Sequence, residues 1–233
     1  MDVQAILPCM DWSGPWWLIV LGFALALLIG TAVYARRSRR SGFFGAAARL
    51  GLAPFLGPVP FNPEERKGFN LFSRGYSATW TNLMVDNPDV PSALLFDFSY
   101  RFGLRIIASV GYSQTVAAFS ARLTSLPDFQ LTPTTSLERM APKLGLQGLY
   151  FESRPEFRKR YWLRARDEIS VRAIFTDTRI DHLAASDPQA MWYVEKIGRW
   201  LLVYSHGRTY SPADLPGFFV AARAMADLFL ATR

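Results

Sequence analysis

Residues that bind metals or form disulfides are scarce in this chain of 233 residues. It has one cysteine, Cys9, and two histidines, His182 and His206. One cysteine excludes an internal disulfide, and so small a set cannot supply a zinc site of ordinary spacing. The chain also lacks a glycine-rich phosphate loop, a G-x-S-x-G nucleophile elbow and a dinucleotide-binding fingerprint. The sequence therefore predicts no metal site, no cofactor and no catalytic residue.

The remaining polar residues suggest no site either. His206 lies in Ser-His-Gly-Arg, at the expected end of a hairpin strand, and a surface histidine with satisfied hydrogen bonds is favoured over a catalytic one. Asp97 and Glu152 are isolated carboxylates without a visible partner in the sequence. These residues do not suggest an enzyme, although a ligand-binding pocket formed by distant residues stays open.

Charge is absent from residues 16–34, WWLIVLGFALALLIGTAVY. A helix of this length covers about 28 Å, close to the ~30 Å hydrocarbon core of a bilayer. The sequence predicts a membrane-spanning helix over residues 16–35, after an external tail of residues 1–15. Without a titratable side chain, the span offers no usual ligand for haem or chlorophyll. Aromatic residues that suit the headgroup level flank it: Trp12, Trp16, Trp17 and Tyr34.

Basic residues follow the span and do not precede it. The arginines after it are Arg36, Arg37, Arg39 and Arg40. A cleaved signal peptide has the opposite order, and a core helix is rarely apolar on every face for five turns. The positive-inside rule places the N-terminus outside and residues 36–233 in the cytoplasm. We also expect the four arginines to hold the following domain close to anionic lipid.

Small residues recur every four positions in the span, at Gly22, Ala26 and Gly30. Such a row lets another helix approach closely, so these residues are candidates for helix packing. The alternative is that glycine and alanine are simply common in membrane helices. The partners expected are membrane lipid and other membrane protein subunits.

The part of the chain after residue 35 is strongly basic. All 26 Lys and Arg lie there with 17 of the 19 acidic residues, which leaves a net charge of +9. Attraction to an anionic leaflet is the favoured explanation of this charge; nucleic acid, which is not expected, and an acidic protein partner are the less favoured alternatives. The basic run over residues 154–166 forms at most a short ridge on the expected strand, with Arg158, Arg160 and Trp162 on one face.

Residues 36–67 are expected to be a basic juxtamembrane and interfacial linker before an α+β domain of residues 68–233. Within the linker, residues 41–61 are apolar but broken by glycine and proline. This composition suits a segment lying in the membrane interface, and the alternative is a linker packed on the domain. The domain has a possible subdivision near residue 126.

The first part of the domain has the alternation of strands. Residues 93–102, ALLFDFSYRF, alternate between an aromatic and a mixed face. With strands over 76–85, 105–110 and 114–122, they predict an antiparallel β-meander of four or five strands.

The second part predicts a strand–helix–hairpin–helix section. A hairpin turn is expected at Ile197-Gly198, and Ser211 and Pro212 are expected to begin the last helix. The other elements are strands over 129–132, 149–151, 157–164, 191–194 and 200–204, a short helix over 136–144, and helix over 167–185 that restarts at Asp177.

Several motifs in residues 68–230 resemble a family of bacterial single-pass membrane-anchored proteins with a cytoplasmic α+β domain of unknown function. They include Phe96-Asp-Phe-Ser-Tyr100, Leu126-Pro-Asp-Phe-Gln-Leu-Thr-Pro133, Phe151-Glu-Ser-Arg-Pro-Glu-Phe157 and Val171-Arg-Ala-Ile-Phe175. The resemblance implies the bacterial cytoplasmic membrane and transfers no catalytic residue. Two functions stay open: a non-catalytic accessory subunit of a respiratory, photosynthetic or secretion complex, and a membrane-tethered enzyme or ligand-binding domain.

Overall fold

The computed structural model divides into two compact units, residues 1–41 and 42–233, called unit 1 and unit 2 below. It describes residues 16–104, 108–121, 125–134, 148–149, 151–185 and 191–231, without the side chains of residues 16, 17, 32, 35 and 36.

Helix α1 spans Trp16–Ala48 and supplies the described part of unit 1. Its large apolar side chains in unit 1 are about half to three-quarters exposed: Leu18, Ile19, Val20, Leu21, Phe23, Leu25, Leu27, Leu28, Ile29, Val33 and Tyr34. Among the residues that the structure describes, no helix combines the length and the apolar character that crossing a membrane requires.

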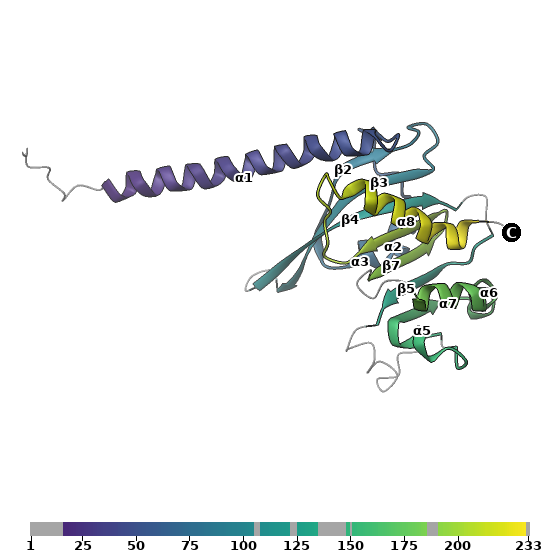
Figure 1. The fold of residues 1–233 in the computed structure, drawn as a ribbon. Coiled ribbons are helices and arrows are strands. Elements are labelled where there is room, and N and C mark those ends of the chain that lie inside the picture. Colours follow the sequence, from purple (N-terminus) through teal and green to yellow (C-terminus); the bar gives the residue numbers. More distant parts are fainter. Residues whose placement is uncertain are drawn as a thin grey trace, which may run out of the picture. The chain divides into compact units, whose positions relative to one another are not determined.

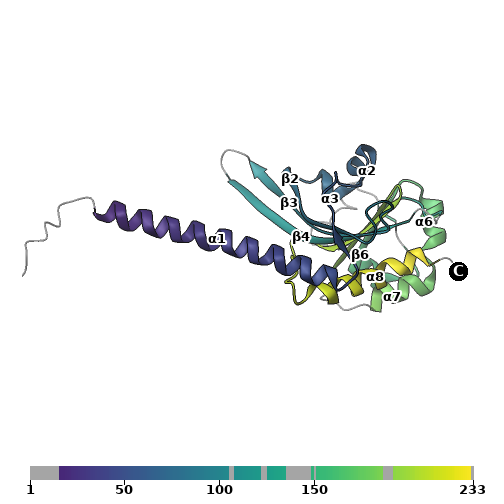
Figure 2. The same cartoon turned by 90° about the horizontal axis from the view of Figure 1, so that it is seen from above.

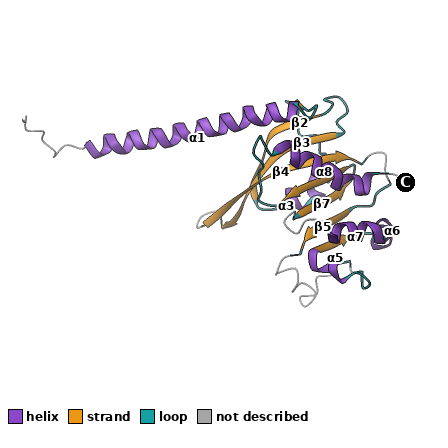
Figure 3. Ribbon diagram, viewed as in Figure 1, coloured by secondary structure: helices purple, strands orange, loops and turns teal. Residues whose placement is uncertain are grey.

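Unit 2 is built on one antiparallel sheet with the strand order β1-β2-β3-β4-β8-β7-β5-β6 (Figures 1 and 3). The strands are β1 (Ala53–Pro54), β2 (Tyr76–Val85), β3 (Ala93–Leu104), β4 (Ala108–Ser120), β5 (Phe129–Pro133), β6 (Tyr161–Ala165), β7 (Trp192–Ile197) and β8 (Trp200–Ser205). The β2–β3–β4 meander pairs directly with β8, so the two ends of the domain sequence meet in the middle of one sheet.

Helices cover both faces of this sheet, as Figure 2 shows. Helix α8 (Leu215–Leu230) lies on one face, and the short helices α2 (Pro63–Gly68) and α3 (Asn70–Ser73) lie on the other. The helices α5 (Pro155–Arg160), α6 (Glu168–Ile174) and α7 (Asp177–Ala185) lie near β5 and β6 (Figure 1). This arrangement makes three layers around two apolar cores.

Alternation along the strands divides their side chains between the two cores. On β3, Leu95 faces the core under α8, whereas Phe96 and Phe98 face the core under α2 and α3. The second core is rich in aromatic rings: Phe61, Phe69, Phe72, Trp80, Phe96, Phe98 and Trp200 contact one another with centroids 5.1–6.4 Å apart. Edge-to-face packing of this kind stabilises a core beyond the area it buries.

The structure confirms the α+β class and the antiparallel sheet. It corrects the strands expected over 105–110 and 114–122, because β4 runs unbroken from Ala108 to Ser120. Gly111 lies inside β4 and pairs with Arg101, so this glycine does not end the strand.

The helix before β6 and the β7–β8 turn also differ from the predictions. Residues 155–160 form helix α5, and Pro155 lies in its first turn. The strand expected over 157–164 therefore starts only at Tyr161. The hairpin turn consists of Gly198 and Arg199, since Ile197 pairs with Trp200. Its Gly198 has a φ of 56°, which favours glycine.

Helix α8 begins at Leu215, later than expected. The Ser211 hydroxyl donates to Asp214 Oδ2 at 2.7 Å in a turn that precedes the helix, so Ser211 does not cap it. The helix expected over 136–144 lies outside the described residues. The strand expected over 149–151 is represented by a single bridge, Leu149 to Leu163.

Residues 42–61 are part of unit 2, and several of them are buried in it. The side chains of Phe43, Ala46, Ala47 and Leu52 belong to the core under α8, and Phe61 belongs to the aromatic core. Leu56 is 93% exposed. Of the two alternatives for this segment, the structure supports packing on the domain.

Candidate functional site

The residues predicted for helix packing lie together on α1. Gly22, Ala26 and Gly30 are exposed, and a Cβ added at either glycine would meet no atom within 4 Å. Tyr34 is 75% exposed, and Arg37 and Arg40 are exposed while Arg39 is half-buried. The other predicted residues fall outside the described part: Trp12 entirely, and Trp16, Trp17 and Arg36 in their side chains.

In unit 2, a fully buried carboxylate belongs to Glu195 of β7. Its Oε2 accepts a hydrogen bond from the backbone N–H of Asn70 at 2.6 Å, and its Oε1 accepts from the N–H of Leu71 at 3.2 Å. The hydroxyl of Tyr204 donates to Oε1 at 2.6 Å. The carboxylate thus ties the start of α3 to the centre of the sheet.

Burial controls the acidity of this group. It raises the pKa of the Glu195 carboxyl, while the hydrogen bonds from Tyr204 and Asn70 act in the opposite direction. Burial also raises the pKa of Tyr204 well above its usual value, and the nearby Glu195 carboxylate adds to this shift. Both shifts follow from the cost of placing charge in a dry interior.

His206 lies beside this group, at the end of β8. Its ring stacks on Tyr112 with centroids 5.2 Å apart and contacts Tyr193 at 5.7 Å. Burial lowers the pKa of His206, and the guanidinium of Arg74 lowers it further. Its Nδ1 is buried without a hydrogen-bond partner among the described residues, so the expectation of a histidine with satisfied hydrogen bonds is corrected.

Two more buried carboxylates are engaged in holding loops and strands. Asp97, expected to be isolated, accepts hydrogen bonds from the Thr115 hydroxyl at 2.7 Å and the Asn82 amide at 2.9 Å. Glu65 completes a capping box with Asn62 at the start of α2. The bond with Asn82 lies at the bulge in the pairing of β2 with β3, where Asn82 has a positive φ of 56°, and the bond with Thr115 joins β3 to β4.

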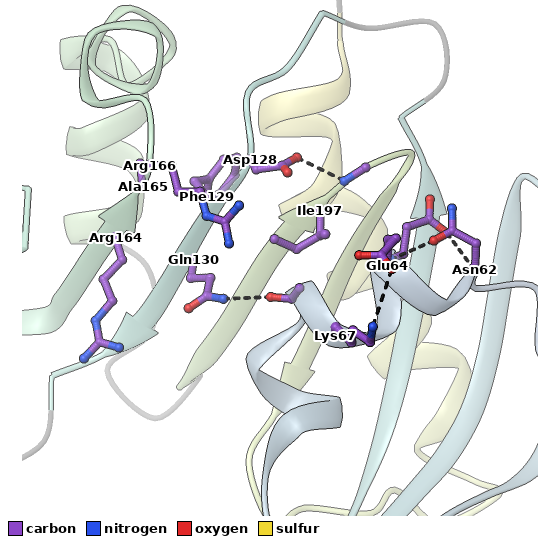
Figure 4. A pocket seen from close by; sticks show the side chains of 13 residues that line it. Asn62, Glu64, Lys67, Asp128, Phe129, Gln130, Arg164, Ala165, Arg166 and Ile197 are labelled. Carbon is purple, nitrogen blue, oxygen red and sulfur yellow. Dashed lines mark hydrogen bonds and ion pairs between the residues drawn. The ribbon is translucent and has the colours of Figure 1, made fainter.

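A pocket of about 770 Å³ opens between α2, the β5–β6 pair and the β7–β8 turn. Figure 4 shows its lining from these three parts of the fold. Gln130 donates a hydrogen bond across it to the carbonyl of Gly68 at 3.2 Å. The residues that line the pocket are Asn62, Glu64, Glu65, Lys67, Gly68, Asp128, Phe129, Gln130, Arg164, Ala165, Arg166, Ile197 and Gly198.

Most charges around the pocket are compensated within the protein. Lys67 lies 3.5 Å from Glu64, and Asp128 accepts from the buried ammonium of Lys196 at 3.0 Å. Arg164 and Arg166 are exposed and form no ion pair with a described residue. The pocket therefore offers two guanidinium groups to a polar or anionic ligand. Among the described residues, no cluster of three metal-ligating side chains exists.

The basic ridge expected from residues 154–166 does not form. Arg158 and Arg160 lie in helix α5, and Arg160 donates to the carbonyl of Ala184 at 2.8 Å. Trp162 lies in the following strand and is buried. Sequence reasoning missed Glu195, although a glutamate inside the apolar strand WYVEKI is a signal for a buried carboxylate.

No family model matches this chain, and no curated protein matches it. Among solved structures, it is similar to the crystal structure of the mycobacterial trehalose monomycolate transport factor A, with a TM-score of 0.47 and 12% sequence identity. The match covers 82% of this chain and 92% of that chain. A similarity at this level carries no inference about function.

Proposed function

We propose that the chain is a non-catalytic accessory subunit of a larger bacterial membrane complex, of the respiratory, photosynthetic or secretion type. Residues 16–34 anchor it in the cytoplasmic membrane, and unit 2 docks on other subunits in the cytoplasm. The observation that carries this function is the exposed apolar surface of α1.

That surface surrounds the helix. Four successive residues fill one turn, and Leu18 to Leu21 are apolar and 49–75% exposed at each position. Apolar residues continue in the same way to Val33, which is 57% exposed. A helix with apolar side chains on all sides is typical of a protein core or a bilayer, and a bilayer is the environment that an uncharged run of nineteen residues suits.

The accessory role is supported by the use of the buried acids in unit 2. Glu195 orders α3, Glu65 caps α2, and Asp97 holds Asn82 and Thr115. Each of these carboxylates accepts hydrogen bonds that fix the backbone or neighbouring strands. Their environment is therefore explained by structure, without a reaction.

The row of small residues is proposed as the contact with a partner helix. Replacing Gly22 and Gly30 by leucine adds apolar area, so anchoring should persist, but close backbone contact is lost. Ala24→Leu with Thr31→Leu is the matched control, because these exposed residues lie on the opposite side of α1.

Extraction of the full chain in mild detergent, followed by native mass measurement, tests this contact. We expect the control to retain the mass of a complex and Gly22→Leu with Gly30→Leu to lose it. A monomeric mass for the unaltered chain contradicts the accessory role. If both double variants retain the mass of the complex equally, the row of small residues is not part of the interface.

The arginines after the span define the proposed orientation and lipid contact. Arg36, Arg37, Arg39 and Arg40 should remain on the cytoplasmic side and attract anionic lipid by about 1 kcal/mol each. A reporter that is active only outside the cytoplasm, fused after Arg233, should stay silent. Strong activity of that reporter contradicts the orientation.

The pocket favours a second function, a membrane-tethered domain that binds a small anionic ligand. Arg164 and Arg166 supply the cations, and the volume of about 770 Å³ suits a metabolite. With millimolar inorganic phosphate as the probe, binding should raise the melting temperature of the full chain in detergent. Arg164→Ala with Arg166→Ala should abolish that rise, and no rise for the unaltered chain counts against this function.

A further inference from the structure

The strands β3 and β4 extend beyond the rest of the sheet as a two-stranded hairpin (Figures 1 and 2). β2 pairs with β3 only as far as Arg101, and β8 pairs with β4 only from Val116. Past these positions, β3 and β4 pair only with each other among the described residues, up to Leu104 and Ala108.

One face of this hairpin is apolar. Phe102 pairs with Val110, and Leu104 pairs with Ala108, so all four side chains lie on the same face of the ladder. Phe102 is 61% exposed, Leu104 67% and Val110 58%. An isolated hairpin is marginally stable in water, and an exposed apolar patch is typical of a contact with a protein or a membrane.

The apolar face continues from the aromatic core of the domain, where Tyr100 is buried and Tyr112 packs against it. The next pair on the same face is Tyr100 with Tyr112, whose rings stack with centroids 5.4 Å apart. The opposite face is polar or small, with Arg101 opposite Gly111 and Gly103 opposite Ser109. The hairpin is therefore amphipathic, with a cation on the polar face.

We propose that this hairpin tip inserts its apolar face, formed by Phe102, Leu104 and Val110, into the headgroup region of the membrane that holds residues 16–34. The inference rests on the proposed anchor. Only seven residues, 35–41, join that run to unit 2, and they span at most about 25 Å, so a bilayer that holds the run is always close to the domain.

Charge and polarity favour lipid over a protein partner. The chain after residue 35 carries a net charge of +9, and an anionic leaflet attracts it. Arg101 can extend its guanidinium toward phosphate while the aromatic rings lie at the interface. The unpaired backbone groups on both edges of the hairpin keep it out of the hydrocarbon core, so the insertion is shallow.

Fluorescent labelling of single cysteines in the full chain tests this contact. In a Cys9→Ser background, Val110→Cys places an environment-sensitive nitrobenzoxadiazole label on the apolar face. Ser109→Cys is the matched control, because it is the neighbouring exposed residue on the polar face. Leu25→Cys reports on the anchor itself. Each labelled chain is reconstituted into anionic vesicles with and without doxyl-labelled lipid as a quencher.

We expect the label at Val110 to shift its emission to shorter wavelength and lose most of its intensity to doxyl lipid, while the label at Ser109 does neither. Equal behaviour of Val110 and Ser109 overturns the insertion. A shift at Val110 without quenching also overturns it, since a second copy or another protein then covers the face. Quenching of the label at Leu25 without quenching at Val110 contradicts the insertion of the hairpin but agrees with the proposed membrane anchor. No quenching at Leu25 contradicts the membrane anchor itself. Circular dichroism of the labelled chains confirms that each is folded.

Discussion

The helix in unit 1 and the sheet in unit 2 are both built from apolar residues, but they differ in how those residues are arranged. The large apolar side chains that the structure describes between Leu18 and Tyr34 of α1 surround the helix and are about half to three-quarters exposed. In the sheet, Leu95 and Phe96 of β3 point to opposite faces, and each is fully buried under a helical layer.

The difference shows what each arrangement requires from its surroundings. A strand sends alternate side chains to two faces, so two covering layers from the same chain satisfy it. A helix that is apolar on all sides would need several neighbouring helices or strands to bury it. In a bilayer, lipid covers the same surface without any neighbouring protein element. The buried apolar residues should therefore determine the stability of unit 2, and the exposed ones should determine where the chain resides.

The largest expected effect on stability comes from Phe96→Ala. This side chain is fully buried in the aromatic core, and its removal should lower the free energy of unfolding by about 3–5 kcal/mol. Leu25→Ala is the contrasting variant, because Leu25 is 57% exposed, and it should change that free energy by less than about 0.5 kcal/mol. Denaturant unfolding of the full chain in detergent measures both. Similar losses of unfolding free energy for the two variants would contradict the difference between the buried residues of unit 2 and the exposed residues of α1.

A somewhat smaller loss is expected from Glu195→Ala. It leaves the N–H groups of Asn70 and Leu71 and the hydroxyl of Tyr204 buried without their acceptor, which should cost about 3 kcal/mol. Tyr204→Phe removes only one donor and should cost about 1 kcal/mol. The same unfolding measurement compares them, and a neutral Glu195→Ala would show that the carboxylate does not hold α3.

The smallest effect concerns pH. Burial and Arg74 place the folded pKa of His206 below its ordinary value of 6.5, so the unfolded chain binds the proton more readily. The contribution of His206 to stability is therefore complete above pH 6.5 and is lost as pH falls through the lowered folded pKa. His206→Gln should flatten this part of the stability–pH curve. A stability–pH curve for His206→Gln that is identical to the curve of the unaltered chain would contradict the shift.

Local patterns in the sequence predict much of the fold. The alternation in ALLFDFSYRF gives β3, and the β-formers over residues 76–85 give β2 with the same bounds. The restart of helix at Asp177 is also confirmed, because residues 168–174 and 177–185 form α6 and α7. These elements are predictable because residues adjacent in sequence determine them.

The remaining errors have physical causes. The gap expected between residues 110 and 114 does not form, because pairing with β3 carries β4 through Gly111. Strand-forming residues after Phe157 obscured the helix start at Pro155. The group around Glu195 joins residues more than a hundred positions apart, since its carboxylate accepts from Asn70 and Leu71, and no local pattern contains that contact.

Membrane retention of the full chain tests most directly whether residues 16–34 are an anchor. Cells that express the tagged chain are lysed, and their membranes are washed with alkaline carbonate, which releases peripheral proteins. We expect the chain to stay with the membranes and Leu25→Arg with Leu28→Arg to release it, since each arginine near the centre of a span opposes insertion by about 2.5–3.5 kcal/mol. An unaltered chain recovered in the carbonate wash would contradict the membrane anchor.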